Sequence, residues 1–291
     1  MKVSVSITNF SWPGPANEIG EHLAATARAA ESAGLDTMWV ADHLVQSDPA
    51  SQPDEPMLEA YTALGFLAGL TRTIRLGTMV TGATFRAPAL LIKAVTTLDV
   101  LSRGRAWLGI GAGYQTDEAS AMGLASPSLS QRFDTLADTI EIATRMWAGD
   151  QSEFHGRRHN LDRPIGSPLP VSQPRPRLLI GGTGERRTLR LVAQHADACN
   201  LFDIPDGGAS VRRQLSILGR HCADVGRPVE EIEKTISTAL PPDEPASRFV
   251  DHCGSLGEAG IDHVVVITRG TPWTDDAIAT LGTTADQLRA A

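Results

Sequence analysis

The stretch Leu178-Leu179-Ile180-Gly181-Gly182-Thr183-Gly184-Glu185-Arg186-Arg187 predicts one complete strand–turn–helix unit, and this unit is the basis of the fold prediction. The three apolar residues are typical of the end of a buried strand, and a segment with helical periodicity follows at 188–195. The glycines between them let the backbone approach a ligand closely. A helix that begins here presents free N–H groups and the positive end of its dipole, which favours phosphate. The alternative is a glycine-rich turn in which Thr183 caps the helix and nothing binds.

The same unit recurs in both directions from this stretch. Strands are predicted at 3–8, 36–40, 74–78, 105–110, 178–180, 198–202, 234–237 and 263–268. Helices are predicted at 17–33, 57–70, 89–101, 131–147, 186–195, 211–225, 246–259 and 274–290. Strands that each precede a helix in this way predict a (β/α)8 barrel, a TIM barrel, spanning 1–291 as one domain, with a doubly wound open sheet as the alternative. We interpret 150–177 as an insertion, because the alternation resumes after it.

Composition narrows the classes of function. The net charge of −8 is spread over interspersed acids and bases, which argues against a nucleic-acid surface. No apolar run approaches a membrane span, and the chain enters a strand pattern at once, without a signal peptide. Its three cysteines have no metal-ligand spacing. We therefore expect a cytoplasmic protein with free thiols, without a metal and without membrane or nucleic-acid partners.

In such a barrel the carboxyl ends of the strands and the loops that follow them form the active face. The corresponding segments are 9–12, 41–43, 79–82, 111–114, 181–184 and 200–203. They contain aromatic residues, a histidine, carboxylates and several glycines, including Gly111 and Gly113. This set suits a flat, phosphorylated cofactor lying across the mouth of the barrel. Phosphate in these barrels usually binds after strands seven and eight, whereas here the glycine turn follows strand five.

His43 is the histidine that this reading places at the carboxyl end of a strand, beside Asp42. A histidine there can exchange a proton or hydrogen-bond a reacting group at neutral pH. The alternative is a structural histidine held under a loop. Asp117 and Glu118 lie in the first turn of a predicted helix, so we interpret them as carboxylates that favour the helix dipole. Tyr114 is either a stacking partner for a cofactor or part of a lid.

Several other chemistries are excluded. The segment 109–114 fails the dinucleotide-binding fingerprint because Tyr114 stands where its last glycine belongs. The sequence has no P-loop, no nucleophile elbow and no zinc-protease helix motif. His155 and His159 are interpreted as polar residues of the insertion rather than as a zinc pair. Arg86 and Arg187 are able to pair phosphate, but exposed arginines are too common for either to be assigned.

Six segments, taken together and in order, resemble the luciferase-like flavin and deazaflavin oxidoreductases. They are 9–14, 34–43, 75–80, 102–105, 108–113 and 180–190. The last is similar to the subgroup that uses coenzyme F420. The resemblance implies a barrel that carries a flavin-like ring, with Asp42 and His43 beside it and His43 as proton donor or acceptor. It also implies a cis Met79–Val80 peptide behind the ring and a phosphate-binding turn at 181–184.

The cofactor-binding residues that follow from this reading are Asp42, Thr78, Met79, Val80, Gly111, Gly113, Gly181, Gly182, Thr183 and Gly184. The insertion at 150–177 matches a variable segment of the family that commonly covers the substrate side. The chain departs from its relatives at Cys199, where they often have tryptophan, and at 44–47, which lack a tryptophan. Tyr114 replaces a glutamate of the deazaflavin-dependent sugar-phosphate dehydrogenases, which argues against a sugar-phosphate substrate.

The leading hypothesis is an oxidoreductase that transfers a hydride between coenzyme F420 and a small organic substrate. The alternative is an FMN-dependent monooxygenase that uses oxygen and reduced flavin from a separate reductase. A third hypothesis is a protein that binds a flavin-like molecule without turnover. The family resemblance also implies a homodimer.

Overall fold

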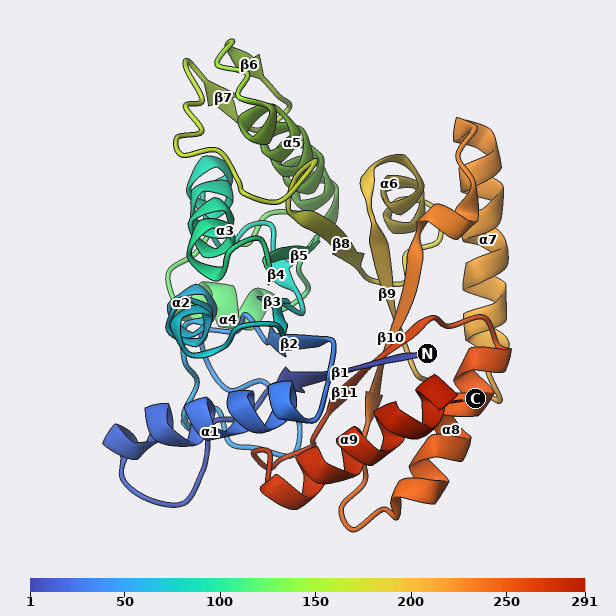
Figure 1. The fold of residues 1–291 in the computed structure, drawn as a ribbon. Helices are drawn as coiled ribbons and strands as arrows, with labels where there is room; N and C mark the ends of the chain where they lie inside the picture. Colours follow the sequence, from blue (N-terminus) through green and yellow to red (C-terminus); the bar gives the residue numbers. More distant parts are fainter. Residues whose placement is uncertain (291) are drawn as a thin grey trace.

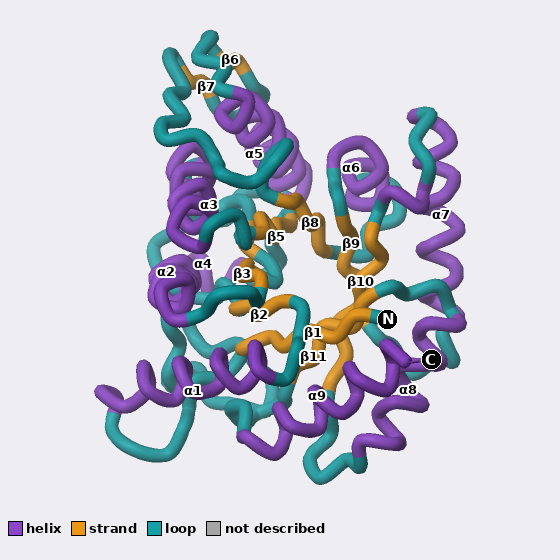
Figure 2. The backbone as a smooth tube through the Cα atoms, in the orientation of Figure 1, coloured by secondary structure: helices purple, strands orange, loops and turns teal. Residues whose placement is uncertain are grey.

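The computed structural model describes residues 1–290, in which parallel strands form an inner ring and helices an outer layer (Figures 1 and 2). The strands of the ring are β1 (Lys2–Ile7), β2 (Thr37–Val40), β3 (Arg75–Thr78), β4 (Thr81–Gly82), β5 (Trp107–Gly111), β8 (Arg177–Gly181), β9 (Ala198–Phe202), β10 (Glu233–Ala239) and β11 (His263–Ile267). The helices are α1 (Ile19–Ser32), α2 (Ala60–Leu70), α3 (Pro88–Ser102), α4 (Thr116–Ala121), α5 (Leu129–Ala148), α6 (Thr188–His195), α7 (Ala209–Val225), α8 (Ala246–Glu258) and α9 (Asp275–Ala290). Short 3-10 turns lie at Ala16–Glu18 and Val229–Glu231.

The strands follow one another in the order β3-β2-β1-β11-β10-β9-β8-β5-β4, and every pair is parallel. The sheet closes into a barrel, because Leu76 of the terminal strand β3 forms a parallel bridge with Ala106, just before β5, and β5 pairs with the other terminal strand, β4. The Leu76 amide donates a hydrogen bond of 2.9 Å to the Arg105 carbonyl. The barrel prediction is therefore confirmed, and the open sheet is wrong.

The predicted elements are all present, with boundaries that shift by a few residues. Helix α2 begins at Ala60 rather than at 57, because the Glu59 carboxylate accepts hydrogen bonds from two amides of its first turn. Helix α5 begins earlier than predicted because Ser128 and Gln131 form a capping box. Helix α6 begins at Thr188 with no side-chain cap, so the alternative in which Thr183 caps it is wrong. The short strand β4 was not predicted.

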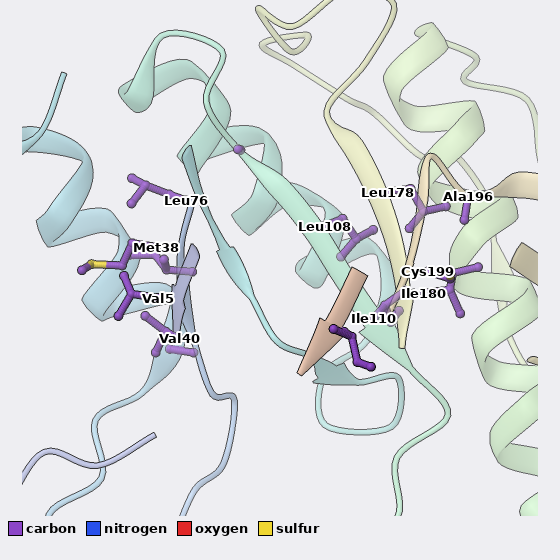
Figure 3. Close-up of a cluster of buried hydrophobic side chains, with 14 of the residues drawn as sticks. Val5, Met38, Val40, Leu76, Leu108, Ile110, Leu178, Ile180, Ala196 and Cys199 are labelled. Atoms are coloured by element: carbon purple, nitrogen blue, oxygen red, sulfur yellow. The ribbon is translucent and has the colours of Figure 1, made fainter. Parts of the chain in front are cut away.

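Alternate residues of each strand face opposite sides of the barrel wall. Outward side chains pack against the helices in the main core, and Figure 3 shows several of them, including Val5, Met38 and Leu108. Inward side chains form a second cluster inside the barrel: Trp39, Trp107, Leu179, Ala198 and Val265, with Met79 and Val80 packed against it. Gly77 makes room for this cluster, because a Cβ there would lie 2.7 Å from the Trp107 Cβ.

The insertion at 150–177 is tied to the outer helices. It contains a small hairpin of β6 (Phe154–His155) and β7 (Asn160–Leu161). The Asp138 carboxylate on α5 accepts hydrogen bonds of 2.7–3.0 Å from the amides of 157–159. The Asp99 carboxylate on α3 likewise accepts from the Val171 and Ser172 amides, at 2.7 and 2.9 Å. The insertion was expected to cover the substrate side, but none of it lines the cavity described below, because these carboxylates hold it against α3 and α5.

The three cysteines are free thiols, as predicted, and all are buried. Burial raises the pKa of the Cys199 thiol to about 12. Among residues 1–290, no helix combines the length and the apolar character needed to cross a membrane.

Candidate active site

A cavity of about 940 Å³ opens at the carboxyl ends of the strands. Its walls are the ends of β1, β2, β3, β9, β10 and β11, together with the loop after β5 and the start of α8. The floor beneath it is the inward cluster of tryptophans and aliphatic residues, with Met79 exposed to the cavity. The cavity therefore lies on the face of the barrel that the sequence assigned to function.

Strand alternation separates neighbouring residues at this face. His43 and Met79 line the cavity, whereas Asp42 and Thr78 do not. His43 continues the inward register of Trp39, and Asp42 continues the outward register of Val40. Of each adjacent pair, the structure thus brings one residue to the cavity and turns the other toward the helices.

His43 is held by a carboxylate that the sequence analysis had assigned to the helix dipole. Its Nδ1 lies 2.8 Å from Oε2 of Glu118, on α4, and the other carboxylate oxygen accepts hydrogen bonds from the Leu44 and Val45 amides. Burial opposes ionisation of Glu118, but the hydrogen bonds from His43 and these amides keep its pKa below the usual value. The interpretation of Glu118 as a helix-dipole residue is therefore incomplete, because it positions His43.

This contact defines which nitrogen of His43 carries a hydrogen. An ionised carboxylate only accepts hydrogen bonds, so Nδ1 is the donor. In the neutral ring, Nε2 is then the acceptor and is available for a proton from a bound molecule. The Tyr114 ring, which also lines the cavity, lies edge-on to the imidazole with centroids 6.3 Å apart.

The Asp42 carboxylate is fully buried in an ion pair with Arg86. Nη1 and Nη2 of Arg86 lie 2.5 and 2.9 Å from the two carboxylate oxygens. The same guanidinium contacts Glu59 and lies 4.9 Å from the centroid of the Tyr61 ring. Despite its own burial, Arg86 has a raised pKa because of these carboxylates. Arg86, left unassigned from the sequence, thus fixes Asp42.

The turn after β3 contains a cis peptide bond between Met79 and Val80, at the position implied by the family resemblance. The Val80 side chain occupies space left by glycines of neighbouring strands. A Cβ on Gly111 or Gly181 would lie 3.1 or 2.9 Å from a Val80 methyl group. The Thr78 hydroxyl is buried and hydrogen-bonds the Gly109 carbonyl at 2.9 Å.

The glycine turn at 181–184 connects β8 with the approach to α6. Gly182 has φ +120°, a conformation that favours glycine, and its amide donates to the Asn200 carbonyl at 3.1 Å. Within residues 1–290, the amides of Thr183 and Gly184 have no hydrogen-bond acceptor. Free amides of this kind fit an anionic group such as phosphate. The turn itself does not line the cavity.

Gly113 lies in the loop after β5 and has φ +76°. Its carbonyl accepts a hydrogen bond of 2.5 Å from Nη1 of Arg132, on α5. Arg132 therefore holds the backbone of this loop in place beside Tyr114. Arg187, the other arginine considered for phosphate, lies with its guanidinium 5.4 Å from the centroid of the Phe133 ring.

The sequence pattern of the luciferase-like monooxygenase family matches residues 1–251. An F420-dependent glucose-6-phosphate dehydrogenase from Kineococcus radiotolerans is 35% identical over 156 residues, which cover 51% of this chain and 45% of that protein. The chain spans about half the length of such curated relatives.

Solved structures share the whole architecture. An F420-dependent secondary alcohol dehydrogenase, in complex with an F420-acetone adduct, superposes with a TM-score of 0.84 at 17% identity, over 99% of this chain and 100% of that one. A monooxygenase from Streptomyces bottropensis superposes with a TM-score of 0.82 at 17% identity, over 100% of both chains. At this level of identity, these likenesses show a common fold.

Proposed function

The chain belongs to the luciferase-like monooxygenase family, and from this premise we propose that it is an oxidoreductase that transfers a hydride between coenzyme F420 and a small organic substrate. The F420-dependent relative that is 35% identical to this chain supports the choice of cofactor. The observation that carries the proposal is the His43–Glu118 pair at a cavity large enough for a planar ring and a small molecule.

The proton that accompanies the reaction is assigned to His43. Glu118 holds Nδ1, so Nε2 accepts a proton from a substrate hydroxyl during oxidation, or returns one during reduction. Coenzyme F420, when bound, supplies or accepts the hydride, which leaves orientation and proton transfer to the protein. Asp42 supports the position of the neighbouring His43 from the outer side of the barrel wall, through its ion pair with Arg86.

The residues proposed to hold the cofactor fall into three groups. Met79 and Val80, with the glycines that clear space for Val80, form the surface behind the ring. Gly182, Thr183 and Gly184 provide the turn for the phosphate, and the free amides of Thr183 and Gly184 support this assignment. Gly113 is proposed to contact the cofactor through its backbone at the mouth of the barrel.

A parallel titration of the purified protein with coenzyme F420 and with FMN, followed by fluorescence, tests the proposal. We expect micromolar binding of F420 and much weaker binding of FMN. The reverse preference would favour the monooxygenase alternative, and oxygen consumption with reduced FMN would then be measured, since that reaction also needs a partner reductase. Binding of neither compound would contradict the proposal.

A further inference from the structure

A second histidine–carboxylate pair lines the same cavity, away from His43. His252 lies on α8, and its Nε2 is 2.8 Å from Oδ2 of Asp203, the residue after β9. Thr238 on β10 donates its hydroxyl to the same oxygen at 2.7 Å and lies 3.2 Å from Nε2. All three residues line the cavity, and the proton transfer assigned to His43 does not use them.

The hydrogen bonds of this cluster leave one ring nitrogen of His252 available. Because an ionised carboxylate only accepts, Nε2 is the nitrogen that donates, and Nδ1 is the acceptor of the neutral ring. No described residue hydrogen-bonds Nδ1, and 43% of the side chain is exposed. The buried ring of Phe249 lies beside the imidazole, with the two ring centroids 6.2 Å apart. His252 is thus a fixed acceptor at the cavity wall.

Topology separates the two histidines along the wall of the cavity. Thr238, beside His252, is on β10, and β2, which precedes His43, lies three places away in the strand order. At about 4.8 Å between neighbouring strands, this is roughly 14 Å along the wall. A molecule whose reacting group meets His43 can therefore place a more distant group at His252.

The charges of the cavity limit the kind of group that binds there. Among its ionisable residues are three carboxylates, Asp48, Asp203 and Glu244, and two guanidiniums, Arg248 and Arg269. Arg248 is paired with Glu244 at 3.3 Å. Arg269, the other guanidinium of the cavity, follows β11, and its charge acts on Tyr114, which lies beside His43. The wall around His252 thus offers an imidazole acceptor beside two carboxylates, and the guanidinium next to it, Arg248, is paired. A phosphate there would be repelled, whereas a neutral hydroxyl can donate to Nδ1.

We infer that His252, fixed by Asp203 and Thr238, is a substrate-positioning residue that binds a hydroxyl group of an uncharged substrate at the end remote from His43. This inference deepens the proposed function and rests on it, because the bound molecule is a substrate only if the protein is an enzyme. It concerns binding in the cavity, however, and so it can be tested without cofactor or turnover.

The first test uses D-glucose and D-glucose 6-phosphate as probes, because they differ only in the phosphate. Dissociation constants are measured by ligand-observed NMR on the full chain without cofactor. We expect saturable binding of D-glucose that exceeds that of D-glucose 6-phosphate. His252→Phe, which keeps a ring against Phe249, and Asp203→Asn should each weaken it by about 3- to 10-fold, the range of one hydrogen bond.

His155→Gln is the matched control, because His155 also faces a carboxylate, Glu153 at 3.3 Å, but lies on the exposed hairpin. It should leave binding of D-glucose unchanged. Equal affinity in the wild type and in His252→Phe, tighter binding of the phosphate ester, or no saturable binding of D-glucose would each overturn the inference. Selective 13C labelling of histidine adds an independent signal: the His252 ring resonance should shift on addition of D-glucose.

A second measurement separates the substrate from the cofactor. His252→Phe should leave the dissociation constant of F420 unchanged and, for a hydroxylated substrate, raise KM while kcat falls little, because the contact is equal in ground and transition states. A loss of F420 affinity in His252→Phe would assign this cluster to the cofactor and overturn the inference. If wild-type protein binds D-glucose but not F420, the proposed function fails while the hydroxyl site stands.

Discussion

Nδ1 of His43 and Oε2 of Glu118 lie 2.8 Å apart, although 75 positions separate the two residues in the sequence. The contact joins the loop after β2 to helix α4, and β3, β4 and β5 lie between these two segments in the sequence. It gives the imidazole one orientation and one tautomer, and leaves Nε2 for the cavity. Glu118 is therefore a positioning residue for the group to which proton transfer is assigned.

Glu118→Gln should lower kcat and leave F420 binding nearly unchanged. The amide keeps the size of the side chain but can donate to Nδ1, which favours the tautomer with the proton on Nε2. Because acid–base catalysis contributes about 100-fold or more, we expect His43→Asn to lose that much and Glu118→Gln to lose a smaller part of it. Steady-state kinetics and F420 titration measure both effects. Unchanged turnover in His43→Asn would remove His43 from the mechanism.

Side chains alternate between the two faces of a strand, and this alternation can be read from the sequence. It separates Asp42 from His43, which were both predicted to lie beside the cofactor ring. Extending the inward register of Trp39 by four residues leads to His43, and extending the outward register of Val40 by two leads to Asp42. The fold, the cavity face and the cis bond were predictable from local pattern and family resemblance. The separation of Asp42 from His43 needed only this further step.

Arg86→Met should destabilise the protein by about 3–5 kcal/mol, because it leaves the buried Asp42 carboxylate without its cation. Asp42→Asn in the same chain should recover part of that loss, since the neutral amide costs less to bury unpaired. Urea denaturation of the wild type, both single variants and the double variant gives the coupling free energy. Additive losses would contradict a direct pair.

Partners from distant parts of the chain were not predictable in the same way. The sequence predicts a helix at Glu118 and a loop at Arg86. The residues next to them in the sequence do not indicate that Glu118 contacts His43 or that Arg86 contacts Asp42. Such contacts depend on how the loops close over the barrel. The same is true of Asp203 and His252, which meet only because β9 and α8 end at one wall of the cavity.

A charged cluster at the amino-terminal face should make stability depend on pH. Burial opposes ionisation of Glu233, but His263, Lys2 and Arg177 surround it and hold its pKa well below the ordinary value of 4.5. A carboxylate with a lowered pKa stabilises the fold fully above its unfolded value, and the contribution is lost as the pH falls toward the folded value.

Glu233→Gln should therefore lower the free energy of unfolding by about 3 kcal/mol at pH 7, and the difference from wild type should shrink as the pH falls below about 4.5. Urea denaturation across this range measures it. Glu230→Gln is the control, because Glu230 is exposed and close in the sequence. A difference that stays constant down to pH 3 would show that the charge of Glu233 is not responsible.

Gly181→Ala tests whether the glycines above the barrel core exist to accommodate Val80. A Cβ at 181 would lie 2.9 and 3.0 Å from the two methyl groups of Val80, so we expect a loss of about 1–3 kcal/mol through overpacking. Val80→Ala removes both methyl groups, and the double variant should lose less stability than the sum of the losses in the single variants.

Gly219→Ala on α7 is the matched control, because nothing lies within 4 Å of its Cβ position. That change should stabilise the protein by about 0.5–1 kcal/mol through helix propensity alone. Thermal and urea unfolding of the four proteins decide the matter, and a double variant whose loss equals the sum would show that Gly181 is there for another reason.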